Sequence, residues 1–328
     1  MNPTRIDPPA SRPANSAPSL WLLTLVLVAL SALGAGASDS PPNSEAASRK
    51  DLVSAVKHLE KKLGFHRTKN FNKQSTESAV DYRCYYTGKL ELPDSYGGLQ
   101  LAPGTKAGCT VDTQQYDVFF YALDAAASGK TPVSATLEHE SVERLLVVVP
   151  HEDFHANKEL RKLPATLGEA SATLIGFLTA SEVARQKFGK NSEVFQNLQR
   201  EPDLFARKAE IVNRFHAQMR QLYAAAQSGE IPEHDALAQK QRALEGLHQQ
   251  CMDINPSPKS FNRCLPANNN AGLAFDETYT KYYLLMYQLY LAKGRQLRPT
   301  LIALQRALDA RTEVEVVKNL EEAVTERN

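Results

Sequence analysis

The sequence predicts a predominantly helical α+β protein, and three features indicate this class. From residue 131 onward, apolar residues recur at the spacing of amphipathic helices. Between residues 65 and 127, alternating polarity and turn residues predict a small sheet. The chain has 328 residues, 42% of them hydrophobic, which suffices for one large domain or two small ones. Its net charge of +1 argues against a general nucleic-acid-binding surface.

The first 37 residues have the pattern of a secretory signal peptide. Two arginines precede a short apolar run over residues 20–33, and an Ala-x-Ala cleavage site ends at Ala37. Cleavage there makes residues 38–48 a linker at the start of an exported protein, periplasmic or secreted. The alternative is an uncleaved anchor that associates with the membrane through residues 20–37, although the apolar run is short for crossing a bilayer.

The remaining chain divides into a small α/β part over residues 49–130 and a helical, metallopeptidase-like part over residues 131–328. An amphipathic helix over residues 49–63 opens the first part. Strand material is expected at residues 82–86, 89–92, 110–111 and 116–123. Helices are expected near residues 139–160, 165–188, 202–228, 233–250, 271–293, 296–310 and 312–326, with loops at 192–203 and 253–270. Pro150 either begins a helix that follows a buried strand or interrupts a longer helix.

Four cysteines predict disulfides, which fits export to an oxidising compartment. Four cysteines allow three pairings, and we expect Cys84–Cys109 and Cys251–Cys264 because each of these pairs is local. The first of these bonds would clamp the small sheet. No C-x-x-C spacing indicates a zinc site at these cysteines.

Residues 151–155 read His-Glu-Asp-Phe-His, an H-E-x-x-H motif. Residues four apart share one face of a helix, so His151 and His155 can bind the same metal ion. Glu152 then lies beside the metal and can accept a proton from its bound water. The competing interpretation is a helix that exposes two histidines and a carboxylate at its surface.

A third metal ligand is expected at Glu169. Pro164 is suited to begin a second helix, which a short turn would fold back against the first. Ala170, Ala172 and Gly176 would permit tight packing of the two helices. Two histidines and a glutamate with an open position for water form the arrangement of hydrolytic zinc sites, so the expected cofactor is Zn²⁺. The alternative for Glu169 is an ordinary carboxylate on a helix surface.

This combination resembles the gluzincin metallopeptidases, and more closely a bacterial family of exported, aminopeptidase-like proteins. That family pairs H-E-x-x-H with a nearby N-E-x-x-A-[TS] helix at a similarly short spacing. Its N-N-A-x-L segment and downstream tyrosine match residues 269–273 and Tyr279. The resemblance covers roughly residues 139–310. The chain departs from the family at Gly168, where the family has Asn, and at Asp153 and Phe154, which replace small or aliphatic residues inside the motif.

The resemblance implies a zincin-like fold and peptide hydrolysis by a zinc-activated water. Glu152 would accept the proton and later deliver it to the leaving amine. The tetrahedral oxyanion needs a further donor, for which Tyr279 is the first candidate and Asn270 a weaker one. Tyr279 is otherwise a core tyrosine, and Asn269 with Asn270 otherwise caps the next helix.

Three functions compete on this sequence. The first is an exported zinc peptidase acting on a peptide or amide substrate, with an aminopeptidase as one form of it. The second is a non-catalytic helical binding protein of the periplasm or cell surface with a structural metal site. The third is a zinc amidase acting on cell-wall fragments. An aminopeptidase also needs carboxylates for the substrate's α-amino group, and the candidates are Glu138, Glu140, Asp276 and Glu277.

Overall fold

A computed structural model describes residues 48–126, 128–160, 163–255, 257, 261, 264 and 266–326. The predicted signal peptide and nearly all of the linker lie outside these residues. Among the described residues, no helix combines the length and the apolar character needed to cross a membrane.

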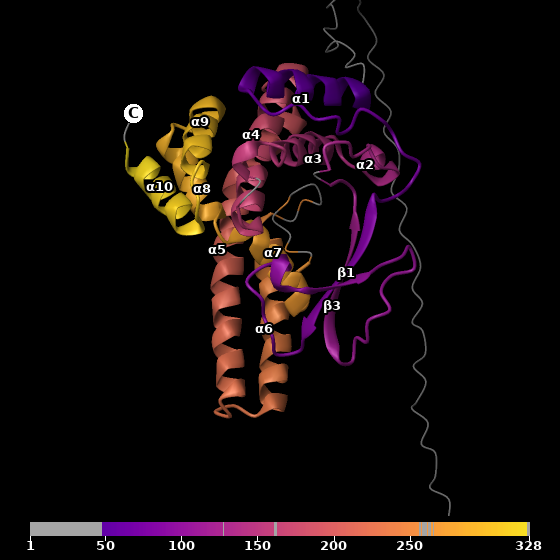
Figure 1. The fold of residues 1–328 in the computed structure, drawn as a ribbon, viewed down its shortest axis with the longest axis vertical. Helices are drawn as coiled ribbons and strands as arrows, with labels where there is room; N and C mark the ends of the chain where they lie inside the picture. The colour runs from indigo at the N-terminus through magenta and orange to yellow at the C-terminus, as the bar shows by residue number, and fades with distance from the viewer. Residues whose placement is uncertain are drawn as a thin grey trace, which may run out of the picture. The chain divides into compact units, whose positions relative to one another are not determined.

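The described chain is mostly helical and carries one small sheet, as the sequence predicts (Figure 1). The helices are α1 (Arg49–Leu63), α2 (Ala135–His139), α3 (Val142–Phe154), α4 (Ala165–Phe188), α5 (Glu193–Gln227), α6 (Glu233–Ile254), α7 (Asn270–Thr280), α8 (Tyr283–Ala292), α9 (Leu297–Leu308) and α10 (Glu313–Thr325). Two short 3₁₀ helices are η1 (Tyr96–Gly98) and η2 (Lys158–Leu160). The strands are β1 (Asp81–Gly88), β2 (Gln100–Pro103) and β3 (Tyr116–Leu123).

The sheet is antiparallel with β1 at its centre, in the order β2-β1-β3. Cys84 in β1 lies opposite Ala102 of β2 and Phe120 of β3. A disulfide joins Cys84 to Cys109 in the segment between β2 and β3, and a second joins Cys251 to Cys264. These are the two local pairs that the sequence favours, and disulfides are typical of proteins from oxidising compartments.

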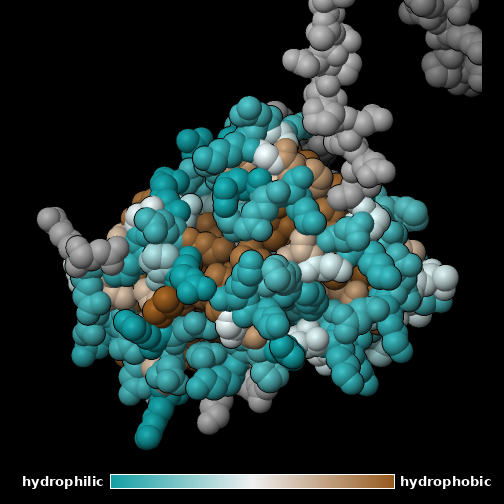
Figure 2. All heavy atoms as spheres, turned by 90° about the horizontal axis from the view of Figure 1, so that it is seen from above, coloured by the Kyte–Doolittle hydropathy of each residue, from teal (hydrophilic) through white to brown (hydrophobic). Residues whose placement is uncertain are grey.

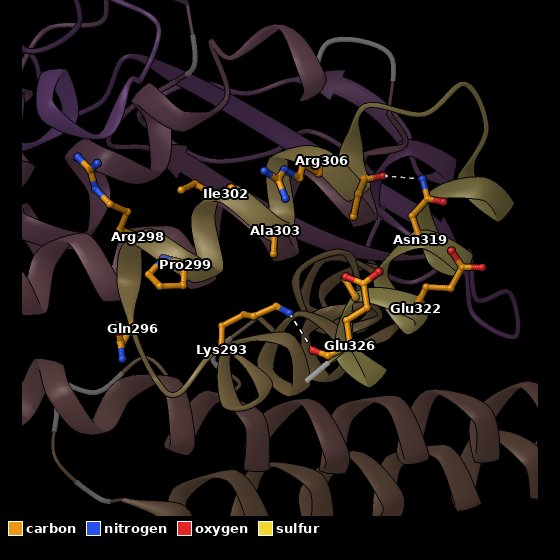
Figure 3. A pocket seen from close by; sticks show the side chains of 12 residues that line it. Lys293, Gln296, Arg298, Pro299, Ile302, Ala303, Arg306, Asn319, Glu322 and Glu326 are labelled. Carbon is orange, nitrogen blue, oxygen red and sulfur yellow. Dashed lines mark hydrogen bonds between the residues drawn. The ribbon is translucent and has the colours of Figure 1, made fainter. Parts of the chain in front are cut away.

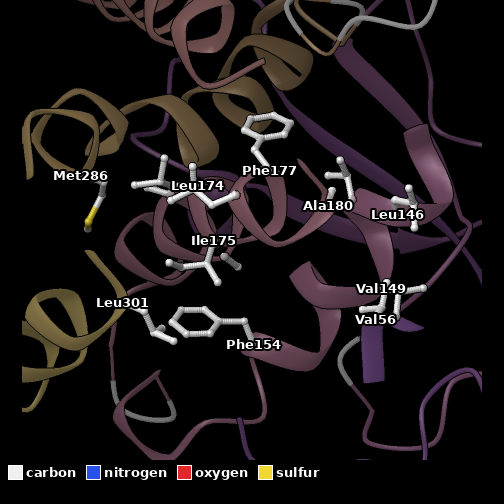
Figure 4. Close-up of a cluster of buried hydrophobic side chains, with 14 of the residues drawn as sticks. Val56, Leu146, Val149, Phe154, Leu174, Ile175, Phe177, Ala180, Met286 and Leu301 are labelled. Atoms are coloured by element: carbon white, nitrogen blue, oxygen red, sulfur yellow. The ribbon is translucent and has the colours of Figure 1, made fainter. Parts of the chain in front are cut away.

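Helix α4 is the centre of the helical core. Its residues from Thr166 to Ala180 are buried on every side, because α1, α3, α5, α7, α8 and α9 all pack against it. Figure 4 shows this core, in which large apolar side chains of several helices meet. They include Val56, Leu146, Val149, Phe154, Leu174, Ile175, Phe177, Met286 and Leu301. Seen from above, the surface is mostly hydrophilic, with hydrophobic side chains in the spaces between (Figure 2).

Helices α3 and α4 pack closely because Gly176 lies at their crossing. A Cβ atom built on Gly176 would come within 3.2 Å of the Val147 carbonyl oxygen and 3.3 Å of the His151 Cβ. A larger side chain would therefore push the two helices apart. Gly176 thus allows the close distance between α3, which carries His151, and α4, which carries Glu169.

Several expected element boundaries are wrong. The expected loop over 192–203 is the start of α5, which Ser192 caps and which continues through Pro202. The stretches at 89–92 and 110–111 are not strands, whereas β2 was not expected. The single helix expected over 271–293 is interrupted between α7 and α8.

Pro150 lies inside α3, so the second of the two alternatives holds, and no strand precedes it in the described segment. The long helix expected over 139–160 is divided as well. Helix α2 ends at His139, Ser141 caps α3, and α3 ends at Phe154, with a turn and η2 after it.

Candidate metal centre

The last turn of α3 and the beginning of α4 bring three candidate ligands together. His151 lies in the last turn of α3, and His155 is the C-cap residue that follows Phe154. Pro164 precedes α4, whose first residue is Ala165, so Glu169 faces α3 from the second turn. The chain reverses between these helices through η2. The turn that the sequence predicts after the motif therefore returns Glu169 to the two imidazoles.

The three candidate ligand atoms form a nearly equilateral triangle. His151 Nε2 lies 3.1 Å from Glu169 Oε2, His155 Nε2 lies 3.2 Å from the same oxygen, and the two nitrogens are 3.2 Å apart. Ligand bonds of 2.0–2.2 Å to a tetrahedral zinc ion imply ligand separations of about 3.3 Å. Among the described residues, this is the group of three side chains with the spacing to hold a metal ion. The donor set and its spacing fit zinc.

The charges in this cluster are strongly coupled. Burial favours the neutral form of Glu169, but the neighbouring imidazoles of His155 and His151 outweigh it and hold the pKa of Glu169 well below its ordinary value. Burial likewise opposes the charged form of His155, yet Glu169 and Glu152 raise the pKa of His155 to about 9. The cluster therefore attracts positive charge, and a metal cation bound by the same atoms would take the place of a proton.

Glu152 lies beside this triangle, half-buried between two cavities. Burial raises the pKa of its carboxyl group, and the attraction of His151 and His155 partly offsets that effect. A general base needs a pKa close to the working pH, and burial is one way in which proteins achieve this. Glu152 therefore lies where a carboxylate could accept a proton beside the candidate ligands.

Tyr279 of α7 lies next to His151. The centroids of the two rings are 6.3 Å apart, and the tyrosine lines both cavities. Its hydroxyl makes no hydrogen bond to any residue that the structure describes, so this donor remains available. Burial, followed by the nearby charge of Glu169, raises the pKa of Tyr279 well above its ordinary value, which keeps the hydroxyl protonated. The tyrosine is therefore near the centre, although it is also half-buried among aromatic side chains.

The structure adds Tyr96, which the sequence analysis does not single out. Its hydroxyl donates to Glu169 Oε1 at 2.9 Å, on the carboxylate oxygen that does not face the histidines. The Tyr96 backbone amide in turn donates to Thr278 Oγ1 at 2.8 Å. The one available signal is a large aromatic side chain within a turn of Pro, Asp, Ser and Gly. Tyr96 thus orients a candidate ligand from a segment far away in sequence.

The two asparagines ahead of α7 have structural roles. Asn269 caps α7, because its side chain accepts from the Gly272 amide at 3.0 Å. The Asn270 side chain donates to the carbonyl oxygens of Lys89 and Glu91 and accepts from Tyr223. Both of its amide hydrogens are therefore engaged away from the metal centre. Asn270 joins α7 to the segment after β1 and is not placed as an oxyanion donor.

Asp153 is neither beside the ligands nor exposed. Its carboxylate accepts from Thr68 at 2.5 Å and from Asn70 at 2.9 Å, and it forms an ion pair with Lys57 of α1. The side chain is only 1% exposed. Asp153 therefore anchors the end of α3 to α1 and to the segment that follows α1.

Two cavities meet at the candidate centre. The larger, of about 580 Å³, is lined by His151, and the smaller, of about 280 Å³, by His155 and Glu169. Glu152 and Tyr279 line both. There is therefore open space on two sides of the candidate ligands and Glu152.

Only two of the four carboxylates considered for an α-amino group border these cavities. Glu140 and Asp276 line the larger cavity, whereas Glu138 and Glu277 line neither. Asp276 already pairs with Lys208. Of the four carboxylates, only Glu140 therefore borders a cavity without an ion pair to a neighbouring lysine, and the four do not form a shared site for a substrate's α-amino group.

A still larger cavity, of about 790 Å³, lies between α9 and α10, away from these residues (Figure 3). It is bordered by Lys293, whose Nζ donates to the Glu326 carbonyl oxygen at 3.1 Å, and by Arg298 and Arg306. None of its lining residues is a candidate ligand or proton acceptor. The largest cavity therefore does not coincide with the candidate metal ligands, which border the two smaller cavities.

The chain cannot be assigned to a family by similarity. No family model, curated protein or solved structure matches it. A function is therefore argued from the geometry and the chemistry of the centre itself.

Proposed function

We propose that this protein is an exported zinc-dependent peptidase. The observation that carries the proposal is the triangle formed by His151, His155 and Glu169, with Glu152 beside it and two cavities opening at it. A structural zinc site would be closed by a fourth protein ligand, whereas a catalytic site keeps an open position. The cavities beside the triangle leave space for that position.

The residues divide the work of amide hydrolysis. Zinc, when bound, supplies a Lewis acid and lowers the pKa of a water molecule to about 7. Glu152 takes the proton released as the water attacks the carbonyl carbon, and returns it to the leaving nitrogen. The Tyr279 hydroxyl donates a hydrogen bond to the oxygen on which negative charge develops. Tyr96 fixes the carboxylate of Glu169 through its other oxygen.

The proposed location rests on separate observations. The two disulfides fit an oxidising compartment. The leader over residues 1–37 has the sequence of a signal peptide, and the resemblance at the motif is to exported proteins. Together these features favour a periplasmic or secreted enzyme.

A peptide-cleavage assay tests the proposal. The zinc-loaded wild-type protein is incubated with a library of quenched fluorescent peptides, beside Glu152→Gln and Tyr279→Phe. We expect cleavage by the wild type, a loss of at least about a thousandfold in kcat for Glu152→Gln, and about tenfold to a hundredfold for Tyr279→Phe.

The matched control is Glu159→Gln, because Glu159 is close in sequence but borders neither cavity. This variant should cleave at the wild-type rate. Cleavage by Glu152→Gln at the wild-type rate would overturn the mechanism. Absence of any cleavage by protein that holds stoichiometric zinc would overturn the peptidase assignment.

A further inference from the structure

The larger cavity beside the metal centre has an unusually aromatic lining. Eight of its twenty lining residues are phenylalanine or tyrosine, whereas aromatic residues make up 8% of the chain. Aromatic walls bind large apolar groups because they offer extensive surface that loses little entropy on binding. The composition of this cavity therefore bears on the substrate.

The aromatic residues form two walls. Phe275 of α7 anchors the first, with its ring centroid 4.8 Å from Phe119 and 4.9 Å from Tyr121 of β3. Phe177 of α4 anchors the second, with its centroid 5.5 Å from Phe205 of α5 and 5.3 Å from Phe261. The two walls come from different elements, so the cavity is built where the sheet, α4, α5 and α7 converge.

The two cationic side chains of this cavity have carboxylate partners within the protein, and the carboxylates of Glu140 and Glu152 also border the cavity. Lys208 Nζ lies 2.7 Å from Asp276 Oδ1, and both side chains are buried. Arg144 Nη2 lies 2.6 Å from Asp124 Oδ2. Because each cation already faces a carboxylate, neither favours a charged occupant strongly. The aromatic part of the lining thus suits a neutral, apolar group.

The cavity adjoins the reacting groups directly. Tyr121, Glu152, Phe275 and Tyr279 line both the larger and the smaller cavity, so the two spaces meet at the proton acceptor. Val148, one turn of α3 before His151, lies on the same side of the helix and borders the larger cavity. A side chain held in the larger cavity therefore belongs to a substrate residue next to the bond that is cut.

We infer that the larger cavity is a specificity pocket for a bulky apolar side chain, aromatic by preference, on a residue adjoining the scissile bond. The inference rests on the proposed peptidase function and names its substrate class. Its volume of about 580 Å³ lies within the range of small-ligand pockets and accommodates one large side chain with adjoining backbone.

Two measurements test this inference. Cleavage by the wild type is compared on blocked peptides that differ at one position, with Phe, Leu, Ala or Lys beside the cut bond. Binding of the same peptides to Glu152→Gln is measured by calorimetry, which requires no turnover. We expect kcat/KM and affinity to be at least tenfold higher for Phe than for Ala, and lowest for Lys.

Two variants change the pocket without touching the reacting groups. Val148→Trp narrows it, because Val148 is half-buried on the cavity side of α3, and should reduce the preference for Phe over Ala at least tenfold. Phe120→Ala removes an aromatic ring that is 38% exposed at the rim, and should reduce the preference about threefold to fivefold. Leu101→Ala is the control, because Leu101 is 58% exposed and borders neither cavity. Zinc content is measured for each variant.

The outcomes separate this inference from the proposed function. Cleavage that is equal for Phe and Ala peptides would overturn the inference and leave the peptidase proposal in place. Selective binding of Phe peptides without cleavage by zinc-loaded wild type would overturn the peptidase proposal and support the pocket. Binding and cleavage that are both unselective, or a preference unchanged in Val148→Trp with intact zinc content, would overturn the pocket.

Discussion

Replacing Tyr96 by phenylalanine should weaken zinc binding without abolishing it. The Tyr96 hydroxyl donates to Glu169 Oε1 at 2.9 Å, while Oε2 of the same carboxylate lies 3.1–3.2 Å from the two imidazole nitrogens. A hydrogen bond to a charged group contributes about 1.5–3 kcal/mol. Since about 1.4 kcal/mol is a factor of ten, Tyr96→Phe should raise the zinc Kd about tenfold to a hundredfold. Outer residues that orient metal ligands have effects of the same size.

The assay is competition for zinc against a chromophoric chelator at fixed pH. Tyr85→Phe is the matched control, since the Tyr85 ring packs against the Tyr96 ring at 6.1 Å but its hydroxyl contacts Arg83. The control should bind zinc as the wild type does. Equal zinc affinity of Tyr96→Phe and the wild type would refute the reasoning that Tyr96 positions the carboxylate.

Three further changes test the framework that holds the centre. Gly176→Val should destabilise the fold by about 2–3 kcal/mol and weaken zinc binding, because the new side chain meets the Val147 carbonyl. Asp153→Ala should lower the free energy of unfolding by about 2–4 kcal/mol, since it leaves partly buried Lys57 with only the more distant Glu60 carboxylate and removes the acceptor of Thr68 and Asn70. Burial raises the pKa of Glu277 from 4.5 to about 8. The native state therefore keeps a proton that the unfolded chain has lost, and stability falls as pH rises from about 4.5 to 8. Glu277→Gln should remove this loss, matching the wild type near pH 4.5 and exceeding it in stability at pH 8.

Urea unfolding and zinc competition measure these effects. Gly246→Val is the control for the glycine, because a Cβ there meets nothing within 4 Å. Asp309→Ala, at an exposed position, is the control for the aspartate. Wild-type behaviour of Gly176→Val or Asp153→Ala would contradict the packing described above. A stability difference between Glu277→Gln and the wild type that stays constant with pH would contradict the assigned titration.

Local signals predicted some elements to the residue. Helix α1 begins after Ser48, whose hydroxyl accepts from the Asp51 amide, and ends before Gly64, which adopts a φ of 84°. Both caps are residue types that favour these positions. Helix α4 begins directly after Pro164, as the sequence predicts. These boundaries are determined by residues next to them, so a single sequence suffices to find them.

The start of α5 differs from the prediction, because the helix includes most of the expected loop over 192–203 and continues through Pro202. Proline lacks the amide hydrogen of the helical ladder, which normally disfavours it within a helix. Here Ser192 caps the helix, and Leu198 and Phe205 bury the same face on both sides of the proline. Tertiary packing against α4 therefore outweighs the local cost, and no local pattern reveals that balance.

In the candidate site too, the residues brought together by local spacing could be predicted, and those brought together by distant segments could not. His151, His155 and Glu169 are predictable because helical spacing and one reversal of the chain bring them together. Tyr96 is not, because it reaches Glu169 only after η1 packs on α7. The sequence leaves the role of Asn270 open for a related reason, since its partners lie after β1 and in α5. Contacts between distant segments leave no periodic pattern in a single sequence, so they cannot be predicted from it.

Zinc stoichiometry is the most direct test of the central claim. The purified protein is equilibrated with zinc, dialysed, and analysed by atomic emission beside His155→Ala, Glu169→Ala and the control Glu159→Ala. The account predicts about one zinc per chain in the wild type and the control, and loss of zinc in both ligand variants. Protein that takes up no zinc, or Glu169→Ala that retains it at full stoichiometry, would contradict the account.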